Sequence, residues 1–439
     1  MSTRVLEASL NGRVVGELRE SNDLWEFEYG ASWLDDPLSF DLSPALGRAT
    51  PIHRDGASIR PVQWYFDNLL PEENLRDLLA GEARIDASDA FGLLAYFGAE
   101  SAGALVLKLP NTAEGERGVV PLPLKTLSER IRQLPVISLV RDAPKRMSLA
   151  GAQHKLLLVE MDGELYEPKP GTPSSHILKP DTVSADYPAS AVNEYFTMRL
   201  AERVGIQVPV VDYRYVPEPV YIIERFDRAG TVPYQERLHA LDTCQLLNKS
   251  RVFKYTTATL GSLREAAEYC RQRAATRLQL FRWVVFNILV GNTDNHLKNV
   301  TFLVGPGRIE LAPAYDLLST AVYATRALVD ERAQWPHVDL TLRVGEARAC
   351  DEITHADVLA AGRELGLSEA TADREAKQMI LALPKTAAAL NAQLEIDLAG
   401  KAEKSTNPAA ARLALARDLR LLRAIEHIVI ADMVRRVAH

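Results

Sequence analysis

The sequence predicts an α+β protein with a small N-terminal α+β subdomain, a strand-rich lobe and an all-helical C-terminal lobe. Alternating apolar runs near the N-terminus indicate a hairpin, and short strand-like runs continue to about residue 237. Beyond that point apolar residues recur at spacings of three and four, which is typical of helices. We therefore expect three parts, spanning residues 1–108, 125–237 and 238–439.

The N-terminal subdomain is predicted from one hairpin and one helix. The runs "VLEASL" and "RVVGEL" flank Asn11–Gly12, a dipeptide typical of tight hairpin turns. The stretch "FDNLLPEENLRDLLAG" has amphipathic helical spacing, and we expect that helix to end at Gly81. Residues 109–124 are rich in Pro, Gly and charge, which is typical of a connection between domains.

The strand-rich lobe is predicted from five short runs and a helix. The runs "KLLLVEM", "ELYEP" and "SHILKP" precede a helix at about residues 189–204, and "VVDYRYV" and "VYIIERF" follow it. The continuous apolar run at 220–223 indicates a strand buried on both faces. Farther along, residues 263–290 predict one long helix that ends at Gly291, and residues 412–437 predict a final amphipathic helix after a loop at 399–411.

Composition and charge narrow the class of protein. The 439 residues are 47% hydrophobic and 25% charged, which is ordinary for a soluble folded chain. No apolar run reaches the roughly 18 residues of a transmembrane helix, and the first residues lack the apolar core of a signal peptide. The spacing of Cys244, Cys270 and Cys350 suits neither zinc nor structural disulfides, so we expect a cytoplasmic protein without membrane association. A net charge of −7 argues against binding nucleic acid alone.

A polar loop, "GNTDNHLKNV", follows the long predicted helix. Asp294 and Asn299 have the spacing D-x-x-x-x-N, in which a kinase places the acceptor of the substrate proton and a magnesium-binding amide. The runs "VTFLV" and "RIELAPAYD" predict a hairpin that leads to Asp316, whose carboxylate could return to the metal. For His296 we favour a phosphate or main-chain contact over zinc. The structural alternative is an Asp- and Asn-rich turn that caps a helix.

Three further segments could contact a nucleotide. The small residues at 150–152 before Lys155 would let backbone N–H groups approach phosphates, although a simple turn into a strand explains them equally well. Lys179 closes a strand as an ATP-clamping lysine does, with Glu194 or Glu202 to orient it; a surface lysine is the alternative. The segment "IIERFDR" (222–228) offers hinge backbone groups and a carboxylate for a ribose; a strand end with a solvated Glu–Arg pair is the alternative.

These segments occur in the order of a protein kinase: phosphate loop, strand lysine, helix, hinge, long helix, catalytic loop and metal aspartate. The order predicts a bilobal, protein-kinase-like fold more strongly than any single segment does. Two other functions stay open, namely a small-molecule kinase of related fold and a catalytically idle co-repressor.

Several segments resemble the HipA family of bacterial serine/threonine kinases, the toxins of HipBA-type toxin–antitoxin systems. They are "SLAGAQHK", "SSHILKP", "NEYFTMRLAERVG", "YIIERFDR", "HALDTCQLL", "FNILVGNTDNHLKN" and "LAPAYDLLST", and "FDNLLPE" extends the resemblance over nearly the whole chain. The resemblance implies that Asp294 is the general base, that Asn299 and Asp316 bind the metal, and that Ser148 is autophosphorylated. It implies ATP contacts from Ala150, Gly151, Ala152, Gln153, His154, Lys155, Lys179, Glu224, Arg225, Phe226, Asp227, His296, Lys298, Asn299, Tyr315 and Asp316.

The same resemblance implies cofactors, partners and a substrate class. The cofactors would be ATP and Mg²⁺. The partners would be a HipB-like helix-turn-helix antitoxin and, through that complex, operator DNA. The substrate would be an aminoacyl-tRNA synthetase, with glutamyl-tRNA synthetase as the first candidate. His154 departs from the acidic residue that the best-known members of the family have at this place, so the resemblance carries over to catalysis but not to the fine conformation of this loop.

Overall fold

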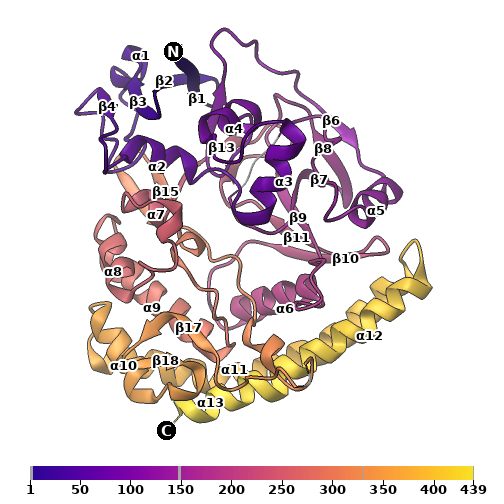
Figure 1. Ribbon diagram of the computed structural model, residues 1–439. Helices are drawn as coiled ribbons and strands as arrows, with labels where there is room; N and C mark the ends of the chain where they lie inside the picture. The colour runs from indigo at the N-terminus through magenta and orange to yellow at the C-terminus, as the bar shows by residue number, and fades with distance from the viewer. Residues whose placement is uncertain (1–2, 147–149, 330, 439) are drawn as a thin grey trace. The chain divides into compact units, whose positions relative to one another are not determined.

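A computed structural model describes residues 3–146, 150–329 and 331–438 of the chain (Figure 1). The residues cluster into two compact units whose boundaries do not follow the three predicted ranges. The first unit comprises Met1–Leu178, Glu224–Lys254 and Thr301–Ala312. The second comprises Lys179–Ile223, Tyr255–Val300 and Pro313–His439. The N-terminal subdomain thus shares one unit with most of the predicted strand-rich lobe.

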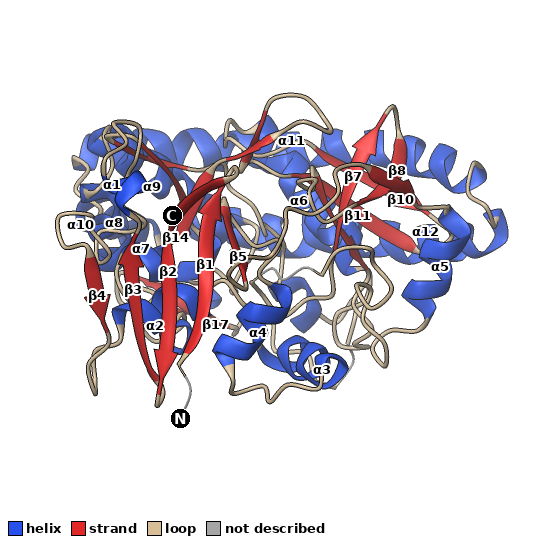
Figure 2. Cartoon of the chain, turned by 90° about the horizontal axis from the view of Figure 1, so that it is seen from above, coloured by secondary structure: helices blue, strands red, loops and turns tan. Residues whose placement is uncertain are grey.

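A five-stranded sheet opens the first unit (Figure 2). Its order is β4-β3-β2-β1-β5, with β1 (Arg4–Leu10), β2 (Arg13–Ser21), β3 (Leu24–Tyr29), β4 (Ile52–Arg54) and β5 (Leu105–Lys108). The predicted hairpin at Asn11–Gly12 is confirmed. Both turn residues have positive φ, 48° and 80°, which the flanking right-handed strand twist requires of a tight turn.

The predicted N-terminal helix is interrupted. The segment forms α2 (Pro61–Asp67) and α3 (Glu73–Ala83), with Pro71 between them. Proline lacks a backbone N–H and disfavours helical geometry in the residue before it, so the helix breaks there. Helix α3 runs past Gly81 and ends at Ala83, and the residue that follows, Arg84, has φ 56°. The helices α1 (Ala31–Leu34) and α4 (Ala90–Phe97) complete this subdomain.

The rest of the first unit is mostly strands. Strand β7 (Leu156–Met161) pairs antiparallel with β8 (Glu164–Pro168) and β9 (His176–Pro180), and β6 (Val119–Pro121) pairs with β8. Helix α5 (Leu124–Arg132) follows β6. The predicted hairpin after residue 300 is confirmed as β15 (Thr301–Gly305) and β16 (Arg308–Leu311), and β15 also pairs with β14 (His239–Asp242). The short elements are β12 (Arg228–Ala229), β13 (Glu236–Arg237), α7 (Thr243–Leu246) and η1 (Arg251–Phe253).

The second unit is mainly helical. Its helices are α6 (Ser190–Arg203), α8 (Leu260–Glu268), α9 (Arg273–Leu289), α10 (His355–Glu364), α11 (Glu369–Glu403), α12 (Pro408–Ala424) and α13 (Ala431–Val437). The 3-10 segments are η2 (Leu297–Asn299), η3 (Ala321–Ala324) and η4 (Cys350–Glu352), and the π-helical segment is η5 (Ile425–Ile430). The hairpins are β10 (Val211–Tyr215) with β11 (Pro219–Glu224), and β17 (Asp339–Val344) with β18 (Ala347–Ala349).

Two predictions for the C-terminal half need refinement. The predicted helix over 263–290 is two helices, α8 and α9, because the chain turns at 269–272 while its apolar residues stay in the core; Cys270, for example, is buried. The part beyond residue 238 is not wholly helical, since β14–β18 lie within it. Among the described residues, no helix is both long and apolar enough to cross a membrane.

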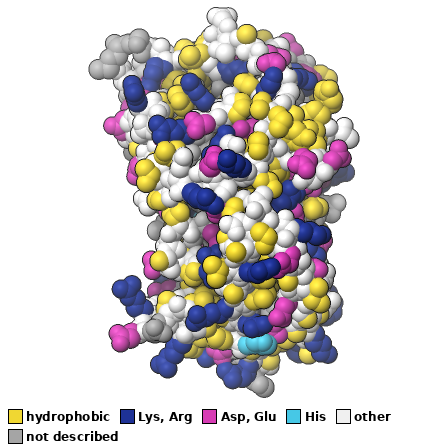
Figure 3. All heavy atoms as spheres, turned by 90° about the vertical axis from the view of Figure 1, so that its right-hand side faces the viewer, with side chains coloured by type: hydrophobic (Ala, Val, Ile, Leu, Met, Phe, Trp, Pro, Cys, Tyr) yellow, Lys and Arg dark blue, Asp and Glu magenta, His cyan; other side chains and the backbone are white. Residues whose placement is uncertain are grey.

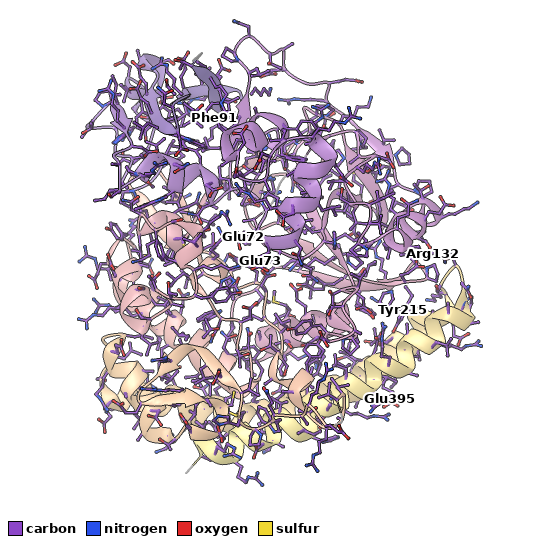
Figure 4. The ribbon with its side chains drawn as sticks, viewed as in Figure 1. Glu72, Glu73, Phe91, Arg132, Tyr215 and Glu395 are labelled. Carbon is purple, nitrogen blue, oxygen red and sulfur yellow. The ribbon has the colours of Figure 1, made fainter. Side chains whose placement is uncertain are left out.

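A buried carboxylate joins α12 to β10 in the second unit. Asp418 is fully buried, and its Oδ2 accepts hydrogen bonds from the hydroxyls of Tyr213 (2.5 Å) and Tyr215 (2.8 Å). Of these three residues, Figure 4 labels Tyr215. Burial raises the pKa of Asp418 to about 7, and the nearby charge of Asp181 adds to this rise. The two tyrosine hydroxyls act in the opposite direction but do not outweigh burial.

Asp418→Asn should therefore change how stability depends on pH. A carboxyl group whose pKa is about 7 in the folded chain, against 3.8 ordinarily, binds its proton more tightly when folded. Its contribution to stability is consequently lost as pH rises from about 4 through 7. An asparagine oxygen can still accept from both tyrosines, but it does not titrate. We expect the melting temperature of the variant, relative to the native protein, to rise between pH 4 and 7. A constant difference in thermal melts would contradict this prediction.

Candidate active site

Helix α9 positions the polar loop at its C-terminal end. Gly291, the first residue of that loop, has φ 63°, and a Cβ there would lie 2.6 Å from Val429 Cγ1 and 3.0 Å from Ala321 Cβ. Only glycine fits this place. The Gly291 carbonyl then accepts from Ala321 N at 2.9 Å, which fixes where the loop leaves the core.

Internal hydrogen bonds hold the loop. Asn292 Nδ2 donates to Asn287 Oδ1 (2.6 Å), and Asn292 Oδ1 accepts from Asp294 N (3.1 Å). The Asp294 carbonyl accepts from Asn299 Nδ2 (2.8 Å) and His296 N (3.1 Å). The helix-capping alternative does not describe Asp294, because η2 begins at Leu297 and the residue before it, His296, makes no side-chain cap. The predicted pair, Asp294 and Asn299, is thus brought together by the loop itself.

Lys179, at the end of β9, is buried and bonded to two carboxylates. Its Nζ donates to Glu194 Oε1 (2.8 Å) and Oε2 (3.1 Å), and also to Asp316 Oδ1. Glu194 is therefore confirmed as its partner, whereas Glu202 is an exposed residue 3.4 Å from Arg199. The alternative of a surface lysine is wrong. Three residues that are far apart in sequence form one ionic cluster.

The electrostatics of this cluster keep Lys179 charged. Burial alone would favour neutral lysine, but Asp316 and Glu194 outweigh it and hold the pKa of Lys179 above its ordinary value. Burial raises the pKa of Glu194 to about 7, against the opposing effect of Lys179. A buried ammonium that is oriented in this way can transfer one of its contacts from a carboxylate to a phosphate oxygen.

The side-chain oxygens of Asn299 and Asp316 are suitable ligands for magnesium. The nitrogen of the Asn299 amide donates to the Asp294 carbonyl, so its oxygen is directed elsewhere and can serve as a ligand. Magnesium prefers such oxygen donors, and it combines one or two protein ligands with water and substrate phosphates. In the described part of the chain, no group of three or more His, Cys, Asp or Glu residues could hold a metal ion. A site with few protein ligands, completed by phosphates, is consistent with both observations.

The predicted phosphate loop lies in the first unit, where the N-terminal subdomain braces it. Gly151 has φ 108°, and its carbonyl accepts from Glu72 N at 3.2 Å. Lys155 Nζ donates to the Ala150 carbonyl at 2.6 Å, so this side chain folds back over the loop. These two hydrogen bonds hold the segment that leads into β7. The predicted autophosphorylation site, Ser148, lies outside the described residues.

His154, the residue that departs from the family, borders a small cavity that Leu75 and Leu79 also line. Burial among these groups lowers its pKa, so the imidazole carries little positive charge at neutral pH. It therefore adds little electrostatic attraction for a phosphate. The side chain packs toward α3 rather than presenting a cation.

The structure argues against one hinge contact. Arg225 and Asp227 are buried, and they pair through Arg225 Nη2 and Asp227 Oδ2 at 2.7 Å. Asp227 Oδ2 also accepts from Gly103 N at 2.6 Å, so this carboxylate is committed to protein groups rather than to a ribose. The alternative of a solvated Glu224–Arg225 pair is wrong as well, because only Glu224 is exposed. The backbone groups of Glu224 and Phe226 remain candidates for a hinge.

Two groups of residues were missed by sequence reasoning. The hydroxyl of Tyr255 donates to Asp294 Oδ1 at 3.1 Å, although Tyr255 belongs to no recognisable motif. Glu100 is fully buried in the first unit and is surrounded by four cations, Lys145, Arg225, Arg228 and Arg237. Neither set has a local spacing that could have revealed it, because Tyr255 is 39 residues from Asp294 and Glu100 is 45 or more residues from each of its cations.

Comparisons of the chain with family models and with known proteins point to the same family. The model described as HipA N-terminal domain matches residues 6–108, and the model described as HipA-like C-terminal domain matches residues 147–387. The putative kinase Y4mE of Sinorhizobium fredii is 36% identical over 343 residues, which cover 74% of this chain and 79% of that protein. The serine/threonine-protein kinase toxin HipA of Shewanella oneidensis is 30% identical over 343 residues, which cover 73% of this chain and 76% of that protein.

A solved structure extends this similarity to the whole chain. The S. oneidensis structure of HipA with HipB and its operator DNA contains a chain with a TM-score of 0.75 and 25% identity. The match covers 98% of this chain and 99% of that one. Two family models, relatives at 30% identity or more and a full-length structural match lead to the same conclusion: this chain belongs to the HipA family.

Proposed function

We propose that the protein is an ATP- and Mg²⁺-dependent serine/threonine protein kinase that acts as the toxin of a type II toxin–antitoxin system. The observation that carries this proposal is the geometry in the second unit. A buried lysine is shared by Glu194 and Asp316, and Asp294 and Asn299 are joined within one loop. These are the residue types that phosphoryl transfer needs. The names of two relatives, a putative kinase and a kinase toxin, support it.

In the proposed reaction, the oxygen of a serine or threonine hydroxyl attacks the γ-phosphorus of ATP. The bond from that phosphorus to the bridging oxygen of ADP breaks, and the hydroxyl proton goes to Asp294. Lys179, oriented by Glu194, would pair with the phosphates of ATP. Magnesium, held by Asn299 and Asp316, would neutralise charge on the transferred group.

Other residues would bind the nucleotide. Backbone N–H groups of Ala150–Ala152 would approach its phosphates, and backbone groups of Glu224 and Phe226 would meet its base. Tyr315 donates through its hydroxyl to the Lys298 carbonyl at 2.6 Å, which holds the catalytic loop against the segment of Asp316. Further predicted contacts come from Gln153, Lys155, His296 and Lys298.

The proposed partners are a HipB-like antitoxin and, through it, operator DNA. The relative's structure contains HipB and operator DNA, which supports this assignment. Figure 3 shows that Lys and Arg on one face are interspersed with acidic and apolar side chains, without a continuous basic block among the coloured residues. With a net charge of −7, the chain would rely on its partner for DNA affinity.

The proposed substrate is an aminoacyl-tRNA synthetase, with glutamyl-tRNA synthetase as the first candidate.

Asp294→Asn tests the function directly. The change keeps the shape of the side chain and removes the proton acceptor, and general-base assistance contributes typically about 10²–10⁴-fold to a rate. Phosphotransfer from radiolabelled ATP and toxicity on expression should both fall by that order, while ATP affinity in calorimetry stays close to native. Asp397→Asn, at an exposed position on α11, is the matched control and should behave as native. Undiminished phosphotransfer by Asp294→Asn would refute the assignment.

Asp316→Ala tests the metal site. Without this carboxylate, the magnesium that offsets the charge of the triphosphate loses a ligand. We expect ATP to stabilise the native protein against heat only when magnesium is present, and this magnesium-dependent shift to disappear in the variant. The protein without ligands should be measured alongside, because the change also removes a partner of Lys179. A shift that survives and still requires magnesium would contradict the prediction.

Phosphorylation of Ser148 should switch the kinase off. A phosphate there adds about −1.5 to −2 charges just before the phosphate loop, and these would repel the triphosphate. Of the two cations that precede it, Lys145 is fully buried against Glu100, whereas Arg146 lies 4.0 Å over the Tyr96 ring and is exposed. Arg146 is thus the cation that could attract the new phosphate.

Mass spectrometry after incubation with ATP and magnesium should find the phosphate in the native protein and not in Asp294→Asn. The purified phosphorylated form should bind ATP poorly; unchanged binding would contradict the switch.

A further inference from the structure

Tyr255 contacts the predicted general base within the second unit. Its hydroxyl donates a hydrogen bond to Asp294 Oδ1 over 3.1 Å. Its ring meets the His296 ring edge-on, with centroids 4.9 Å apart and planes at 80°. Both contacts reach the catalytic loop, and the role proposed for Asp294 does not require either of them.

The chemistry of this contact matches that of a substrate. A serine or threonine acceptor must bring a hydroxyl within about 2.6–3.2 Å of the general base before its proton can move. The Tyr255 phenol is also a hydroxyl donor, and it already holds an oxygen of the Asp294 carboxylate at such a distance. The phenol would therefore compete with an acceptor hydroxyl that approaches the same oxygen, Asp294 Oδ1.

The exposed position of Tyr255 allows its side chain to rotate away from Asp294. The residue is 43% exposed, whereas Tyr213 and Tyr221 of the same unit are 0% exposed and fixed in the core. A rotation of its side chain toward solvent would break, among its contacts, a solvent-exposed hydrogen bond and a ring contact. An exposed hydrogen bond contributes little net free energy, because water replaces the lost partner. A docked acceptor could therefore displace this contact.

We propose that Tyr255 occupies the place of the acceptor hydroxyl on Asp294 and gates access to this base, an inference that rests on the proposed kinase function. When no protein acceptor is docked, the phenol keeps water from Asp294 and so restrains wasteful hydrolysis of ATP. A protein substrate displaces the ring and presents its own hydroxyl. The gate therefore favours acceptors that bind well enough to replace Tyr255 over water.

Tyr255→Phe tests the gate without a known substrate, because water can serve as the acceptor. The change removes the hydroxyl and keeps the ring on His296. The rate of ATP hydrolysis is measured from the release of phosphate, with magnesium and without added protein. We expect this rate to become about fivefold faster, the factor that the loss of one hydrogen bond implies. Tyr255→Leu, which also lacks the hydroxyl, should show the same direction of change. The affinity for ATP in calorimetry should stay at its native value.

Tyr269→Phe is the matched control. Tyr269 has the same exposed fraction, 43%, at the end of α8, and its change should leave hydrolysis as it is. Thermal melts of all variants check that they fold. Rates equal to native in both Tyr255 variants would overturn the gate. Slower hydrolysis would overturn it too, because it would mean that the phenol orients Asp294 for catalysis.

The variant Asp294→Asn distinguishes a failure of the gate from a failure of the proposed kinase function. If that variant hydrolyses ATP as fast as the native protein, Asp294 is not the base, and the proposed function fails along with the gate. If Asp294→Asn is slow while Tyr255→Phe is no faster than native, the base assignment stands and the gate alone is wrong. Acceleration in both Tyr255 variants, with slow Asp294→Asn, supports both.

Discussion

The carboxylate of Glu100 is the interaction on which the first unit depends. It is fully buried, with Lys145 Nζ at 2.5 Å and Arg228 and Arg237 each at 2.7 Å. Burial alone would raise its pKa, but the surrounding cations hold that pKa well below its ordinary value. Removing one member of such a buried group typically costs about 3–5 kcal/mol, because charges are left uncompensated. The folded first unit therefore requires Glu100 to be ionised.

This cluster explains why the first unit crosses the boundaries that the sequence predicted. Glu100 belongs to the N-terminal subdomain, Lys145 precedes the phosphate loop, and Arg225 and Arg228 belong to the hinge segment. A second connection joins Glu72 to Gly151 through backbone atoms. Two segments that are predicted to contact ATP are thus held by the N-terminal subdomain. The N-terminal subdomain therefore helps to position the segments that are predicted to contact ATP.

Sequence reasoning succeeded where chemistry was local and failed where it was not. The Asn11–Gly12 turn and the Asp294–Asn299 pair could be predicted, because turn preference and loop spacing are visible within a few residues. The Lys179–Glu194 pair was one of two possibilities, since a strand end and the next helix offered two acids. The contact of Asp227 with Gly103 and the contact of Tyr255 with Asp294 could not be predicted. They join residues 39 or more positions apart, and helical or strand periodicity carries no information over such separations.

Both carboxylates that the proposed reaction needs are held by internal donors. Asp316, with φ 51°, accepts from Lys179, and Asp294 accepts from the Tyr255 hydroxyl. Each internal donor has a counterpart among the proposed ligands: a metal ion for Asp316 and an acceptor hydroxyl for Asp294. If magnesium and ATP bound as proposed, Lys179 would exchange the Asp316 carboxylate for a phosphate oxygen, and its buried ammonium would keep a partner. Before any ligand binds, Glu194 and Asp316 already compensate the buried charge of Lys179, which lets this cluster fold without its ligands.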